Sequence, residues 1–133
     1  MSVNPRVLVI DDDEIVREVM CELLRGRGFD VFDSGSPIGV TKAIGDQKID
    51  VIVLDVMMPG LCGDKLAKLL RNNPRMPQLA IVLVSGSDPI TLTKIAAEVE
   101  ADAVVPKSEI HLELSMAVIA AHRRRCLART AVR

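Results

Sequence analysis

Residues 51–60, VIVLDVMMPG, decide the fold: four apolar residues run directly into an acid, Asp55, and a Pro-Gly pair follows. Short runs of β-branched residues and Leu that end at turn residues are typical of buried parallel strands. Residues 7–13, VLVIDDD, have the same form and end in three consecutive acids, Asp11–Asp13. Ligands of open α/β sheets bind outside the carboxyl ends of the strands, so these acids are predicted to converge at that edge. A cluster of carboxylates there would suit Mg²⁺, which prefers oxygen ligands.

The remaining chain alternates short apolar runs with helical patterns, which is the sequence form of repeated βαβ units. Three further strands are predicted at residues 30–32, 79–84 and 103–105. Right-handed crossovers between the strands would place helices on both faces of a five-stranded parallel sheet, so the fold class is α/β. At the starts of the first two helices, Asp13 is predicted to be an N-cap in preference to a metal ligand, and Ser36 is predicted to be an N-cap before Pro37.

The composition describes an ordinary soluble globular chain of 133 residues, 49% apolar and 26% charged, with a net charge of −1. This length suits one domain with a single core. The three cysteines are odd in number and lack a C-x-x-C spacing, which argues against a disulfide framework or a zinc site. No stretch has the roughly 18 uninterrupted apolar residues of a membrane span, and no signal peptide precedes the acids, so a cytoplasmic location is expected.

Charge is unevenly distributed along the chain. Residues 122–133 hold five arginines and no acid, whereas residues 1–121 hold 12 basic and 18 acidic residues. We interpret residues 1–5 as an N-terminal extension, residues 6–121 as the domain and residues 122–133 as a basic C-terminal extension. A frayed, solvated terminus is expected for the last segment, and nucleic-acid binding is not predicted.

Four segments together resemble the receiver domain of two-component response regulators. They are residues 7–13, 53–60, 83–86 and 105–107, and they occur in the family's order within residues 6–121. The resemblance implies a flavodoxin-like sheet with strand order 2-1-3-4-5. It also implies a stand-alone response regulator, which is a phosphoacceptor and not an enzyme apart from self-catalysed phosphotransfer and autodephosphorylation.

The resemblance assigns roles to the acids at the strand ends. Asp55 would be the nucleophile that accepts a phosphoryl group from a phosphohistidine and forms an aspartyl phosphate. Asp11 and Asp12 would hold Mg²⁺ together with Asp55 and the backbone carbonyl of Met57. Without the ion, the neighbouring carboxylates would repel one another and the incoming phosphate. The phosphodonor would be a histidine kinase or a histidine phosphotransfer protein.

Two further residues complete the implied site. Lys107 would supply a second positive charge besides Mg²⁺, and the hydroxyl of Ser85 would donate a hydrogen bond to a phosphoryl oxygen. Receivers usually have a Pro in a cis bond after this Lys, whereas Ser108 follows Lys107 here. A cis bond before a non-proline residue costs about 2.5–4 kcal/mol, so a trans bond and a different loop are expected. Val104 stands where the family usually has an aromatic rotamer switch, so switching is expected to involve small displacements only.

These departures leave an alternative open, a pseudo-receiver that acts as an interaction module without phosphorylation. A phosphatase of the haloacid-dehalogenase type also uses an aspartate after a strand. That class places a second Asp two residues further on, where this chain has Met57. Nucleotide binding is not predicted, because no G-x-x-x-x-G-K or G-x-G-x-x-G loop occurs.

The output is expected to be contact with a downstream target protein. The last helix has two apolar stripes, and a helix that packs on a sheet buries only one of them. The stripes are Leu112, Met116 and Ile119, and Leu114, Val118 and Ala121. The stripe around Leu114 and Val118 is predicted to be the outer one. It would either bind a target or a second copy of the chain, or be buried by the neighbouring helix.

Overall fold

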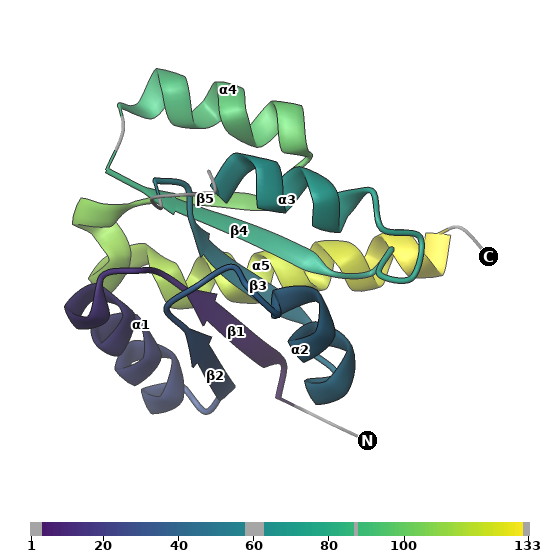
Figure 1. The fold of residues 1–133 in the computed structure, drawn as a ribbon, viewed down its shortest axis with the longest axis horizontal. Helices are drawn as coiled ribbons and strands as arrows, with labels where there is room; N and C mark the ends of the chain where they lie inside the picture. The colour runs from purple at the N-terminus through teal and green to yellow at the C-terminus, as the bar shows by residue number, and fades with distance from the viewer. Residues whose placement is uncertain (1–3, 58–62, 87, 132–133) are drawn as a thin grey trace.

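Five parallel strands form one sheet in the order β2-β1-β3-β4-β5, which confirms the predicted flavodoxin-like topology (Figure 1). The computed structural model describes residues 4–57, 63–86 and 88–131, and the predicted turn at Pro59 and Gly60 lies outside them. The strands are β1 (Arg6–Ile10), β2 (Asp30–Ser34), β3 (Val51–Asp55), β4 (Ala80–Ser85) and β5 (Ala103–Pro106). The helices are α1 (Glu14–Gly26), α2 (Val40–Gln47), α3 (Gly63–Arg71), α4 (Pro89–Val99), a short 3-10 helix (Lys107–Glu109) and α5 (Ile110–Ala131).

The central strands are buried on both faces, and the two faces carry different residue types. Toward α1 and α5 the three central strands present mainly Val, namely Val7, Val9, Val51, Val53, Val82 and Val84. Toward α2, α3 and α4 they present Leu and Ile, namely Leu8, Ile10, Ile52, Leu54, Ile81 and Leu83. Successive side chains of a strand point to opposite faces, and both faces are covered. The strands therefore appear in the sequence as continuous apolar runs.

Helices α1 and α5 cover one face of the sheet, and α2, α3 and α4 cover the other (Figure 1). Helix α5 packs through Leu114 and Val118, whose side chains are fully buried. The prediction that these two residues form the outer stripe is therefore wrong. In the other stripe of α5, Leu112 and Met116 are exposed, at 78% and 58%. Both stripes are equally apolar, so helical spacing alone does not tell which of them faces the sheet.

The first two helices begin in different ways. Asp13 caps α1 as predicted, because its carboxylate accepts hydrogen bonds from two backbone N–H groups of the first turn. The predicted cap of α2 at Ser36 is wrong, because α2 begins only at Val40. The residue before it, Gly39, has a left-handed backbone with φ of 79°, which postpones the start of the helix. The Ser36 hydroxyl instead accepts a hydrogen bond of 3.1 Å from the backbone N–H of Ile38.

One buried carboxylate fixes the amino end of β5. Asp102 accepts hydrogen bonds of 2.8 Å from the side chains of Arg71 and Arg125 and from the backbone N–H of Ile81. Its side chain is fully buried, and the donors come from α3, α5 and β4. Because Arg125 is held in this way and α5 continues to Ala131, the expectation of a frayed C-terminal segment is wrong for this part of the chain. None of the described helices is long and apolar enough to span a bilayer.

We expect Asp102→Ala to lower the free energy of unfolding by about 3–5 kcal/mol, because it leaves buried guanidinium groups without their carboxylate. Asp46→Ala is the matched control, since Asp46 pairs with Lys42 on the exposed surface of α2. That loss should be below about 1 kcal/mol. Urea unfolding followed by circular dichroism measures both values. Equal losses in the two variants would contradict the role given to Asp102.

Candidate functional site

The register of the sheet brings three acids together at its carboxyl end. Ile10 of β1 pairs with Leu54 of β3, so Asp11 and Asp55 follow at the same level of neighbouring strands. One carboxylate oxygen from each of Asp11, Asp12 and Asp55 lies within 4.8 Å of the other two. Asp11 and Asp55 are buried, at 0% and 1% exposure, whereas Asp12 is exposed. The cluster therefore has a closed inner side and an open outer side.

Lys107 reaches the same cluster from the end of β5. Its Nζ lies 3.2 Å from Oδ2 of Asp55 and 3.9 Å from Oδ2 of Asp11. The peptide bond to Ser108 is trans, as predicted, and Lys107 begins the short 3-10 helix that leads into α5. Burial by itself would lower the pKa of Lys107, but the hydrogen bond to Asp55 and the nearby acidic charges raise it overall. Lys107 is therefore a protonated, partly buried partner of Asp55.

The carboxylate oxygens of Asp55 and Asp11 differ in the hydrogen bonds that they accept. Oδ1 of Asp55 accepts a hydrogen bond of 3.0 Å from the backbone N–H of Met57, and Oδ1 of Asp11 accepts one of 2.9 Å from the backbone N–H of Asp13. Oδ2 of Asp11 is buried and has no hydrogen-bond partner among the described residues. Burial, together with the neighbouring charge of Asp55, raises the pKa of Asp11 to about 6.

This donor set fits a small divalent cation. The three acids each offer a carboxylate oxygen, the kind of ligand that Mg²⁺ prefers, and these oxygens are close enough to share one ion directly or through its retained waters. Oδ2 of Asp11, which has no hydrogen bond within the described residues, is the kind of buried polar atom that needs a ligand. A cation would also favour the ionised form of Asp11, which burial alone disfavours.

Ser85 and Met57 lie at the same edge of the sheet. Ser85 ends β4, is fully buried and pairs in register with Pro106 of β5. The Met57 side chain is 65% exposed, and its backbone N–H is the donor to Asp55. That Ser85 contacts a phosphoryl oxygen and that the Met57 carbonyl binds a metal both stay predictions.

Sequence reasoning missed Gly63, the first residue of α3. Its backbone N–H donates a hydrogen bond of 2.9 Å to the carbonyl of Val56. A Cβ at this position would lie 2.2 Å from the backbone carbonyl oxygen of Asp55 and 2.8 Å from Cα of Val56. A side chain there would have to displace the backbone that carries Asp55, so the close approach requires glycine. A glycine that opens a helix has no distinguishing pattern in a single sequence.

The chain matches the family model of the response regulator receiver domain over residues 7–119. This match covers most of the chain, so the chain belongs to the receiver domain family of two-component signalling. Receiver domains interact with histidine kinases, and members of the family generally bind Mg²⁺ at an acidic pocket.

Individual relatives agree with this assignment. The DNA-binding response regulator MtrA of Mycolicibacterium smegmatis is 31% identical over 106 residues, which are 80% of this chain and 45% of that protein. The cyclic di-GMP phosphodiesterase of Thermotoga maritima is 30% identical over 108 residues, which are 81% of this chain and 28% of that protein. This chain therefore spans less than half the length of these two relatives. The Francisella response regulator 1452 receiver domain superposes with a TM-score of 0.78 at 27% identity, over 91% of this chain and 98% of that one.

We expect Asp11→Asn to stabilise the protein in the presence of a chelator, because it removes a buried negative charge beside Asp55. The pKa of Asp11 is raised from 3.8 to about 6 in the folded state, so the folded chain holds this proton more tightly than the unfolded chain does. The parent should therefore lose stability as the pH rises through this window, and Asp11→Asn should not. The advantage of the variant should grow to at most about 3 kcal/mol above the window. Urea unfolding across this pH range measures it, and a pH-independent difference would contradict the argument.

Proposed function

We propose that this chain is a phosphoacceptor, in which Asp55 takes a phosphoryl group from the phosphohistidine of a histidine kinase or histidine phosphotransfer protein. The observation that carries this proposal is the meeting of two acids and one lysine around a buried aspartate, Asp55, at the carboxyl end of the sheet. This is the edge at which open α/β sheets bind their ligands. Membership of the receiver family supports the same reading.

The residues around Asp55 suit in-line phosphoryl transfer, which needs alignment and neutralisation of charge and little else from a protein. A carboxylate oxygen of Asp55 would form the new O–P bond while the P–N bond to the donor imidazole breaks, and the bonding electrons leave with the imidazole. The Met57 N–H holds one carboxylate oxygen in a fixed direction. Lys107, 3.2 Å from the other oxygen, is close enough to pair with a phosphoryl oxygen bound there. The hydroxyl of Ser85, on the adjacent strand, would donate to a further phosphoryl oxygen.

Mg²⁺ is the cofactor that the acids would hold. The ligands would be the carboxylates of Asp11, Asp12 and Asp55 and the carbonyl of Met57. When bound, the ion would supply the positive charge that offsets both the carboxylates and the oxygens of the incoming phosphate. The feature that most supports the assignment is Oδ2 of Asp11, which is buried and accepts no hydrogen bond from the described residues.

We further propose that the output is protein contact through α5, by way of Ser85 and β5. Leu112 and Met116 form the exposed stripe of α5, where a target protein or a second copy of the chain would bind. The chain has only two aromatic residues, Phe29 and Phe32, and both lie at the edge of the sheet opposite β5. No aromatic side chain can therefore act as a switch near Val104, and the structural change on phosphorylation would be small.

A second candidate function is a pseudo-receiver that binds its partner without phosphorylation. Val104 favours this alternative, because it takes the place of the aromatic residue that couples phosphorylation to the output face in the family. The ion pair between Lys107 and Asp55 argues against a pseudo-receiver, since an interaction module has no need of a buried, charge-paired aspartate.

We expect a small-molecule phosphodonor with Mg²⁺ to add one phosphoryl group to Asp55, and we expect this group to be labile in both acid and base, as an acyl phosphate is. Asp55→Asn should abolish the addition, because an amide is not a comparable nucleophile. Asp46→Asn, on the exposed surface of α2, should retain it. Intact-protein mass spectrometry measures each case. A phosphoryl group that persists in Asp55→Asn would place the nucleophile elsewhere, and no addition to the parent under several donors would favour the pseudo-receiver.

Magnesium titration should perturb amide resonances at the ends of β1 and β3, around Asp11, Asp12 and Asp55, and binding should be weak because Mg²⁺ keeps several of its waters. Asp12→Ala should weaken binding, since it removes an open-side ligand without creating a cavity in the core. NMR amide shifts are the suitable readout, because the chain has no Trp or Tyr for intrinsic fluorescence. An unchanged dissociation constant in Asp12→Ala would mean that the acid pair is misassigned.

A further inference from the structure

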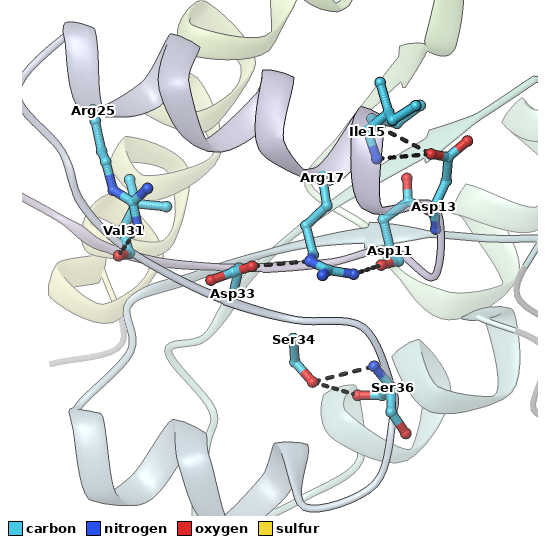
Figure 2. A network of polar contacts seen from close by, with 10 residues as sticks. Asp11, Asp13, Ile15, Arg17, Arg25, Val31, Asp33, Ser34 and Ser36 are labelled. Atoms are coloured by element: carbon cyan, nitrogen blue, oxygen red, sulfur yellow. Dashed lines mark hydrogen bonds and ion pairs between the residues drawn. The ribbon is translucent and has the colours of Figure 1, made fainter.

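Arg17 of α1 bridges the ends of two strands beside the acidic cluster. Its Nη1 donates a hydrogen bond of 2.8 Å to the backbone carbonyl of Asp11, and its Nε donates one of 2.9 Å to Oδ2 of Asp33 in β2. Figure 2 shows the guanidinium lying between these two acceptors. The Arg17 side chain is mostly buried, at 18% exposure. Arginine is suited to this contact because its planar fork presents several donors in fixed directions.

The carbonyl that Arg17 binds belongs to the peptide group between Asp11 and Asp12. Strand pairing of β1 ends at Ile10, so this carbonyl lies beyond the ladder of β1 and β3. The N–H of Asp11 still bonds to the carbonyl of Ser34, at 3.3 Å. Arg17 therefore fixes the plane of the peptide from which both members of the acid pair project. A buried carbonyl that lost this donor would either turn toward another partner or stay unsatisfied, which is unfavourable.

The loop after β2 leaves room for the guanidinium. A Cβ on Gly35 would lie 2.7 Å from Nη1 of Arg17 and 3.4 Å from its Cζ. Glycine at this position therefore leaves the space that the guanidinium occupies between the ends of β1 and β2. The backbone of Gly35 is not left-handed, so an alanine there would act mainly by pushing the flexible end of Arg17 aside.

We propose that Arg17, held by Asp33 and accommodated by Gly35, is a positioning residue that orients the acid pair Asp11 and Asp12 for Mg²⁺. This inference rests on the proposed function, in which Mg²⁺ binds those acids. For the Mg²⁺ affinity of a variant without Arg17, this inference predicts a change opposite to the one that simple electrostatics predicts. Removal of a positive charge near a cation site should tighten cation binding, whereas loss of a positioning contact should weaken it.

The test compares the Mg²⁺ dissociation constants of Arg17→Gln and Arg25→Gln, measured with MgCl₂ by amide shifts at constant ionic strength. Arg25 is a close match, because it also lies on α1 and donates from its guanidinium to a backbone carbonyl of β2, that of Val31, at 3.1 Å (Figure 2). Arg17→Gln should weaken Mg²⁺ binding by about 10-fold. Arg25→Gln should leave it unchanged or slightly tighter. Circular dichroism melts of both variants verify that the folded state is the one titrated.

If the Mg²⁺ dissociation constant of Arg17→Gln is no larger than that of Arg25→Gln, the inference is overturned while the proposed function stays intact. A parent chain that binds no Mg²⁺ at these acids would overturn the proposed function and this inference with it. If Arg17→Gln does not fold, Gly35→Ala takes its place, because it moves the guanidinium without changing any charge. Its control is Gly45→Ala in α2, where a Cβ would meet no atom within 4 Å. Gly35→Ala should bind Mg²⁺ more weakly than Gly45→Ala, and equal affinities would overturn the inference.

Discussion

Two carboxylates buried side by side, those of Asp11 and Asp55, set the constraint on which the rest of the site depends. Ionised carboxylates held away from water repel each other and cost free energy unless positive charge lies near them. With Asp12 included, three acids lie together, and among the described residues Lys107 is the cation that contacts their carboxylates. This edge of the sheet therefore needs a bound proton or a further cation, and the raised pKa of Asp11 reflects that need. A site that costs stability in this way is typical of residues kept for function.

Strand β5 connects this constraint to the rest of the fold, because charged residues flank both of its ends. Lys107 follows the strand and pairs with Asp55, and Asp102 precedes it and binds Arg71 and Arg125. The strand between them has only four residues. The buried ion pairs at its amino end thus hold in place the strand that aims the lysine at its carboxyl end. The two clusters have opposite characters, since the Asp102 cluster is satisfied by hydrogen bonds and the Asp11 cluster is not.

Most of the fold could be predicted because its signals are local. Apolar runs mark strands buried on both faces, acids mark their ends, and the cap at Asp13 needs only its own neighbours. The features that could not be predicted depend on residues far apart in the chain. Asp102 binds partners that lie 21 to 31 residues away in the sequence. Arg17 of α1 binds Asp33 of β2, which lies 16 residues away. The left-handed backbone at Gly39 is likewise invisible in a sequence that permits a cap at Ser36 equally well.

The most direct test of the phosphoacceptor site is one amide spectrum recorded in three states: the free protein, the protein with Mg²⁺, and the protein with Mg²⁺ and a phosphate mimic. We predict that Mg²⁺ alone shifts resonances around Asp11, Asp12 and Asp55. The mimic should then extend the shifts to Ser85, at the end of β4, and enlarge those of Lys107, which follows β5. Both residues would pair with phosphoryl oxygens that Mg²⁺ alone does not supply. A mimic that leaves Ser85 and Lys107 unchanged, in a protein that binds Mg²⁺, would contradict a single site formed by all of these strand ends.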